Sequence, residues 1–220
     1  MPEQSPAVGI SFGDASLSAL LTTTRTRIAS LAGRSWRDVE DSISIRVKNL
    51  VDSNAHRAVD APTQQWLQRS SLVLAAYEVL EPLAGRAEVL AILRDALIAP
   101  FKTGVSRYLA DRFGISDDAP SEAFVRIAEN FKKRGEDRFG QAFVYVEDVQ
   151  DATRSFTNIH RCFFNDFFRA NGAPEVTSIF CALDKVWADA LQERRYGVRF
   201  DRPTTLAQGD DVCRFQFSKE

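Results

Sequence analysis

The fold of this chain turns on the stretch that reads Ala142-Phe143-Val144-Tyr145-Val146-Glu147-Asp148-Val149. This run is β-branched and aromatic, which predicts a strand. Before it, apolar residues recur at spacings of three and four, which predicts helices. The change separates a helical region, residues 15–135, from an α+β region, residues 136–220, and we expect the two to form one integrated domain.

Four further elements are predicted on the C-terminal side of this stretch. A helix is expected from about Thr153 to Ala170, and another from Pro174 to about Leu191. Two strands follow, at residues 196–201 and 211–217. The predicted fold class is α+β: a helical N-terminal half packed on a C-terminal β-α-α-β-β unit with a small antiparallel sheet.

On the N-terminal side, helices are expected near residues 14–31, 35–50, 60–80, 86–113 and 121–133. Pro62 fits the first turn of the third, and Pro100 is expected to kink or divide the fourth. Residues 1–14 are predicted to be a flexible lead-in. They contain Gly9-Ile10-Ser11-Phe12-Gly13, which matches a nucleophile elbow in its letters only, because no strand precedes it.

Composition and charge restrict the class of protein. Of 220 residues, 45% are hydrophobic and 26% charged, which is typical of a globular protein. The net charge of −2 gives no indication of a nucleic-acid-binding surface. We interpret the basic run at 132–138 as a solvated loop and not as an anion site. Neither a secretory signal nor a membrane span is recognisable. Three cysteines predict free thiols in the cytoplasm, and homo-oligomer formation is left open.

The chemistry-bearing residues gather in the last sixty positions. Sixteen phenylalanines against one methionine predict a core of rigid rings that could also wall a small-molecule pocket, with Phe164 and Phe180 as candidate substrate contacts. Metal-ligand spacing, a P-loop and a dinucleotide fingerprint are not found, so neither a metal nor another cofactor is expected.

His160 is expected on the helix 153–170, stacked among phenylalanines three and four residues away. It is either a buried histidine bonded to backbone or a base at a pocket wall. Cys162 would lie on the other side of that helix, as a small packing residue.

Cys181 and Asp184 are three residues apart on the next predicted helix, and therefore share a face beside an apolar stripe. A carboxylate in that position is costly unless it has partners or a task. Because a nearby carboxylate raises a thiol pKa, Asp184 would not activate Cys181 by charge. The alternative is that both residues only flank a packing seam.

On the last predicted strand, alternation directs Cys213 inward with aromatic residues and Arg214 to the other face. Gly209 is expected to supply a positive φ in the preceding connection, and Asp210 either caps that connection or takes part in catalysis.

Several runs in the C-terminal third keep a characteristic order and spacing. They are Cys162, Gly172-Ala173-Pro174-Glu175, Ile179-Phe180-Cys181, Asp184, Val198-Arg199-Phe200-Asp201-Arg202, Thr204-Thr205-Leu206-Ala207 and Gly209-Asp210-Asp211-Val212-Cys213-Arg214-Phe215. In these runs the chain resembles the L-2-amino-thiazoline-4-carboxylic acid hydrolase family. Weaker similarity surrounds Ala75-Ala76-Tyr77. Phe163-Phe164 and Pro203 depart from the expected pattern and could change the pocket's shape.

The resemblance implies hydrolysis of a cyclic amidine-like C–N bond that opens a thiazoline ring. As a hypothesis, Asp184 or Asp210 would pair with the cationic amidine, while Arg199, Arg202 or Arg214 would hold the substrate carboxylate. Attack would come from water activated by His160 or a carboxylate, or from Cys181 or Cys213 through a covalent intermediate.

Three other functions are compatible with the sequence. One is a related ring-forming or ring-opening enzyme of small-molecule biosynthesis. Another is a non-catalytic small-molecule-binding module. The third is a helical partner protein that uses its first 135 residues as an interface.

Overall fold

The computed structural model describes residues 14–28 and 33–220. The described residues form eight α-helices and four strands. The helices are α1 (Asp14–Arg27), α2 (Trp36–Asn54), α3 (Ala61–Ala84), α4 (Arg86–Thr103), α5 (Val105–Phe113), α6 (Ala123–Phe139), α7 (Phe163–Ala170) and α8 (Thr177–Leu191). The strands are β1 (Val144–Gln150), β2 (Arg154–Arg161), β3 (Val198–Asp201) and β4 (Cys213–Lys219). The α+β prediction is therefore confirmed. The predicted lead-in up to residue 13, the Gly9–Gly13 match and the predicted helix end near Leu31 lie outside the described residues.

Local sequence explains where the N-terminal helices begin and end. The Ser35 hydroxyl accepts from the Asp38 backbone N–H, and the Asp38 side chain accepts in return from the Ser35 N–H. Asp60 and Thr63 form the same reciprocal pair at the start of α3. Each such cap contributes about 1 kcal/mol to helix stability. Helices α4 and α5 are divided at Gly104, four residues after Pro100.

The predicted helix 153–170 is wrong in its first half. Residues Arg154–Arg161 form β2, and only Phe163–Ala170 is helical. The Asp151 side chain accepts hydrogen bonds from the backbone N–H groups of Thr153 and Arg154, at 2.9 and 2.8 Å, which closes a turn between β1 and β2. Side chains in β2 are buried alternately, so the period is two, and the helical spacing of the phenylalanines was coincidental there.

The sheet is antiparallel, with the strand order β1-β2-β4-β3. Its register shifts twice within β1, between Val144 and Tyr145 and again between Glu147 and Val149. One face is buried, and carries Tyr145, Ile159 and the Cys213–Phe215–Phe217 series. The other face is more exposed. The C-terminal unit therefore runs β-β-α-α-β-β, one strand more than expected.

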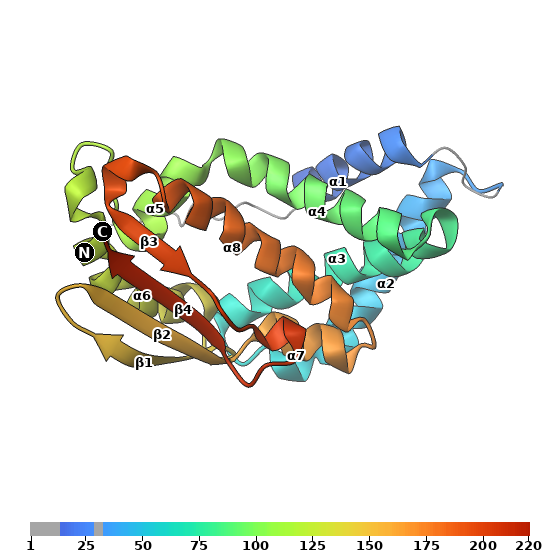
Figure 1. Cartoon of the computed structure of the whole chain (residues 1–220). Helices are drawn as coiled ribbons and strands as arrows, with labels where there is room; N and C mark the ends of the chain where they lie inside the picture. The colour runs from blue at the N-terminus through green and yellow to red at the C-terminus, as the bar shows by residue number, and fades with distance from the viewer. Residues whose placement is uncertain (1–13, 29–32) are drawn as a thin grey trace, which may run out of the picture.

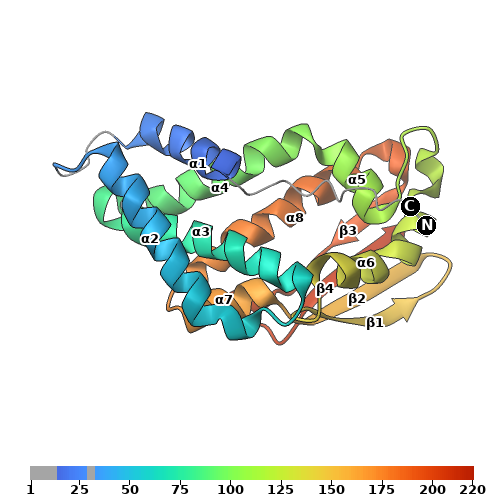
Figure 2. The same ribbon diagram turned by 180° about the vertical axis from the view of Figure 1, so that it is seen from behind.

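Helices cover the buried face of the sheet. Helix α6 contacts β1, β2 and β4, while α8 contacts β3 and packs on α4 and α5. In Figure 1, α8 runs diagonally across the molecule with α4 above it; Figure 2 shows α6 lying along the sheet from the other side. The Tyr77 hydroxyl on α3 donates to Glu175 Oε1 at 2.6 Å, which links the helical half to the turn before α8. In the described part of the chain, every helix is too short or too polar to cross a bilayer.

Candidate active site

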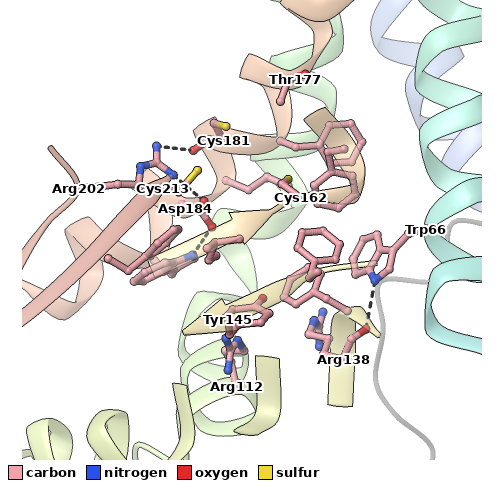
Figure 3. Close-up of a pocket in the computed structure, with 18 of the residues that line it drawn as sticks. Trp66, Arg112, Arg138, Tyr145, Cys162, Thr177, Cys181, Asp184, Arg202 and Cys213 are labelled. Atoms are coloured by element: carbon pink, nitrogen blue, oxygen red, sulfur yellow. Dashed lines mark hydrogen bonds and ion pairs between the residues drawn. The ribbon is translucent and has the colours of Figure 1, made fainter. Parts of the chain in front are cut away.

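A cavity lies between the helices and the buried face of the sheet. It leaves about 130 Å³ of free space for water-sized molecules. Eleven of its 23 lining residues are aromatic, so most of its wall is apolar. Figure 3 shows aromatic rings between a group around Asp184 and a second group that includes Arg138. Two opposite walls with different chemistry therefore face one hollow.

Helix α8 contributes a polar stripe to the cavity. Thr177, Cys181 and Asp184 follow one another at spacings of four and three residues, and all three line the cavity. Cys213 comes from β4, Arg202 follows β3, and Cys162 precedes α7. We call these six residues the C-terminal wall.

Asp184 is held in one orientation by two donors. Trp187 Nε1 donates to its Oδ1 at 3.0 Å, and Arg202 Nη1 donates to its Oδ2 at 2.7 Å. Arg202 Nη2 also donates to the Cys181 carbonyl at 3.3 Å, so the guanidinium bridges two residues of α8 (Figure 3). Burial raises the pKa of the Asp184 carboxyl above its ordinary value, although the positive charge of Arg202 opposes that shift.

All three thiols are held in their protonated form. Burial, and then the negative charge of Asp184, raises the pKa of Cys181 to about 12. Burial also raises the pKa values of Cys162 and Cys213. The Leu206 backbone N–H donates to Cys213 Sγ at 3.2 Å, which opposes the shift at that residue. Nucleophilic attack by any of them requires a proton acceptor first.

The cavity brings together six of the residues singled out from sequence: Cys181, Asp184, Cys213, Arg202, Phe164 and Phe180. The rings of Phe164 and Phe180 stack with centroids 4.3 Å apart. Cys162, which was interpreted only as a packing residue, lines the cavity as well.

Four other candidates lie outside it. His160 is exposed on β2, so the expected burial among phenylalanines on a helix is wrong. Asp210 Oδ2 accepts from the Thr205 N–H at 2.8 Å, near Gly209 with its φ of 96°, which is the capping role. Arg199 lines a shallow hollow with Gln216, away from the cavity, and Arg214 Nη1 donates to Thr204 Oγ1 at 3.0 Å.

The opposite wall escaped the sequence analysis. Arg69 of α3, Arg112 of α5 and Arg138 of α6 line the cavity, and we call them the helical wall. Arg138 belongs to the run that was interpreted as a solvated loop; that interpretation is wrong, because the run lies within α6. One signal was present: Phe131 and Arg138 are seven residues apart, which places both on one helix face. For Arg69 and Arg112 the sequence gives no comparable signal.

Within residues 14–28 and 33–220, the His, Cys, Asp and Glu side chains do not cluster in threes in a way that could hold a metal ion. The thiols of the C-terminal wall share a cavity without forming such a group.

Comparison with known proteins identifies the family. A family model described as L-2-amino-thiazoline-4-carboxylic acid hydrolase matches residues 66–217. The matched span begins at Trp66, far upstream of the C-terminal motifs, and includes every residue that lines the cavity. Neither the curated proteins nor the solved structures contain a match to the chain. Because the matched span is well over half of the 220 residues, the chain belongs to the L-2-amino-thiazoline-4-carboxylic acid hydrolase family.

Proposed function

We propose that the protein hydrolyses a C–N bond of a small cyclic amidine of the 2-aminothiazoline-4-carboxylate type inside this cavity. One observation carries the proposal: a single carboxylate, Asp184, is fixed by Trp187 and Arg202 in an aromatic cavity of about 130 Å³. A cavity of about 150 Å³ accommodates benzene, so the space suits one small ring.

The positive charge of the protonated amidine would lie next to the Asp184 carboxylate. C2 of an aminothiazoline stands between sulfur and two nitrogens, and is electrophilic once the amidine is protonated. A carboxylate stabilises that cation and can also take a proton from an attacking water. The water oxygen bonds to C2, the bond from C2 to the ring nitrogen breaks, and the proton passes to the departing amine. The product keeps a carbamoyl group on sulfur and gains a free amino group.

The raised pKa of Asp184 suits both proton transfers, from the attacking water to the carboxylate and from the carboxyl to the departing amine. A carboxyl whose pKa is raised towards neutrality is a better base than an ordinary one, and can return the proton to the amine. Arg202 keeps the group ionised enough to accept the proton from water. We therefore propose Asp184 as the acid–base residue.

Covalent attack by Cys181 is the second route. Cys181 lies next to Asp184 on α8, so the carboxylate could accept the thiol proton as sulfur attacks C2. The pKa of about 12 makes this route more demanding than attack by water. Cys213 is the other candidate nucleophile, because the hydrogen bond from the Leu206 N–H to its Sγ favours the thiolate.

The test is turnover of 2-aminothiazoline-4-carboxylate, followed by release of the free amine, in the wild type and in Cys162→Ser, Cys181→Ser and Cys213→Ser. Ring opening at undiminished rates in all three variants supports attack by water. Loss confined to Cys181→Ser supports the covalent route. Tight binding without ring opening contradicts the proposed reaction and favours a non-catalytic binding module. Such a module would not need a thiolate, which agrees with the raised pKa values of the three thiols.

A further inference from the structure

The charges around the cavity do not balance. Its lining residues include four arginines, namely Arg69, Arg112, Arg138 and Arg202, and one acid, Asp184. Asp184 already binds Arg202 at 2.7 Å. Among the described residues, the cavity lining therefore offers Arg112 and Arg138 no second carboxylate. Cations that lose water on burial need an anion or several acceptors to compensate for it.

Arg138 has the clearest unsatisfied hydrogen-bond donor among these arginines. Its Nε is buried and has no hydrogen-bond partner among the described residues. Its guanidinium lies 5.4 Å from the centre of the Tyr108 ring, so an aromatic face supports it on one side. Asp111 and Asp137 line an outer hollow beside Arg138, and Asp111 pairs with Arg107 at 3.8 Å; neither acid lines the cavity itself. Because buried polar groups are normally hydrogen-bonded, this donor calls for an acceptor such as water or an anion from outside the described residues.

Arg112 adds a second positive charge to the lining of the cavity. It is only 3% exposed, and its guanidinium lies over the ring of Phe131 at 4.8 Å. Arg112 Nη1 donates to the Asn130 carbonyl at 3.4 Å, and the Tyr108 side chain is a further hydrogen-bond partner. Gly135 of α6 makes room for it, because a Cβ there would lie 2.7 Å from Arg112 Nη2. The fold therefore buries a cation at a position where an apolar side chain would cost less desolvation free energy.

Arg69 is the third cation of the group. Its guanidinium lies 4.7 Å from the centre of the Trp66 ring. Burial and then the positive charge of Arg138 lower its pKa, so the two guanidinium groups repel each other. Arg69 and Arg138 also line an outer hollow beside Asp137, so they lie between the cavity and the surface.

We propose that Arg138, supported by Arg69 and Arg112, is the carboxylate-binding subsite of the cavity, and that the ligand is a single-ring carboxylate. This inference deepens the proposed function and rests on it for the orientation of the ring. With the carboxylate at the helical wall, the cationic end of the ring points across the aromatic rings toward Asp184 (Figure 3). The assignment moves carboxylate binding from Arg199, Arg202 and Arg214 to arginines of the helical half; Arg202 instead pairs with Asp184 at 2.7 Å.

The experiment uses two ligands that cannot be hydrolysed, thiazole-4-carboxylate and uncharged thiazole, with dissociation constants from calorimetry. Arg138→Met is expected to weaken binding of the carboxylate by about 10- to 100-fold, because it removes a charge-assisted hydrogen bond. Binding of thiazole should stay within about twofold, since that ring has no anionic group for Arg138 to bind. Arg126→Met is the matched control: Arg126 lies on the same helix and pairs with Glu122 at the surface, and neither ligand should detect its loss.

Equal weakening of both ligands, or no weakening of either, overturns the inference. Should Arg138→Met fail to fold, Arg138→Lys decides. Lysine keeps the charge but loses the planar fork, so a several-fold loss for the carboxylate alone is expected, and unchanged binding overturns the inference. Carboxylate-selective binding in a protein that does not open 2-aminothiazoline-4-carboxylate contradicts the proposed reaction only. Ring opening together with Arg138-independent binding contradicts the subsite only.

Discussion

The two walls of the cavity differ in how well their polar groups are satisfied. On the C-terminal wall, Asp184 receives two hydrogen bonds, Arg202 makes two, and Cys213 receives one from backbone. On the helical wall, Arg138 keeps a buried Nε that finds no acceptor within the part of the chain that the structure describes. A group whose orientation is fixed by its own neighbours is prepared for chemistry, whereas an unsatisfied donor is prepared for a ligand. The comparison thus supports the proposal that the reaction takes place at the C-terminal wall and carboxylate recognition at the helical wall.

The largest effect is expected from Asp184→Asn, which keeps an acceptor for Trp187 but removes the charge. Turnover should fall by about 10²- to 10⁴-fold, as for loss of a general acid–base group. In the wild type, kcat/KM should rise with pH as Asp184 loses its proton. The midpoint of this rise should lie above pH 3.8, the ordinary pKa of aspartate, because burial raises the pKa of Asp184. The variant should lack that rise.

Asp189→Asn is the control for this change. Asp189 lies on the same helix and pairs with Lys185 at 3.3 Å on the surface, so its loss should leave turnover unchanged. If Asp184→Asn retained turnover within twofold of the wild type, chemistry could not be assigned to the C-terminal wall.

Thiol reactivity tests the same wall by a method that needs no substrate. With a pKa of about 12 in place of 9.0, Cys181 should carry about 1000-fold less thiolate at pH 8 than an unfolded cysteine. Iodoacetamide labelling, followed by peptide mass, should be slower by a similar factor in the folded protein than in guanidinium chloride. Rapid labelling of folded Cys181 would instead reveal an activated thiol and favour the covalent route.

Gly135→Ala tests the packing of the helical wall. The added Cβ would lie 2.7 Å from Arg112 Nη2 and 2.9 Å from Tyr145 Cζ. We expect a loss of about 1–3 kcal/mol in unfolding free energy from overpacking, although alanine normally stabilises a helix relative to glycine. Urea denaturation measures it. Gly104→Ala is the control, because its nearest atoms lie at 4.0 Å. If Gly135→Ala were as stable as the wild type or more stable, Arg112 would be able to move aside without loss of unfolding free energy.

The smallest effect concerns Thr177, the exception on the C-terminal wall. Its hydroxyl is buried and has no hydrogen-bond partner in residues 14–28 and 33–220. The same holds for the Ser70 hydroxyl, but Ser70 does not line the cavity. Thr177→Val and Ser70→Ala should each raise the unfolding free energy by about 1 kcal/mol or leave it unchanged. Only Thr177→Val should also weaken binding of thiazole-4-carboxylate, in the same calorimetric assay. A loss of stability in Thr177→Val would show that the hydroxyl is already satisfied within the protein.

Local signals in the sequence predicted the framework but not the opposing wall. The helix breaks at proline and glycine, the β1 strand and the three-residue spacing of Cys181 and Asp184 depend on near neighbours only. Alternation placed Cys213 inward and Arg214 outward, and the structure has Arg214 outside the cavity. The same rule would have revealed β2, had the alternation of Ser155, Thr157 and Ile159 been weighed against the phenylalanine spacing.

The arginines of the helical wall depend on tertiary contacts instead. Arg69, Arg112 and Arg138 lie on three separate helices, and each would be an ordinary surface residue on an isolated amphipathic helix. Only the packing of α3, α5 and α6 against the sheet directs them toward one hollow. The tie between Tyr77 and Glu175 is similar, since 98 residues separate its partners.

The irregular border of the sheet also bears on self-association. Strand β1 is one edge and changes register twice along its length, while the other edge, β3, has only four residues. A bulged or very short margin offers a neighbouring molecule few evenly spaced backbone groups. Joining two copies by extending the sheet would thus gain little, and an assembly of this chain would have to use its helices or the exposed side of the sheet.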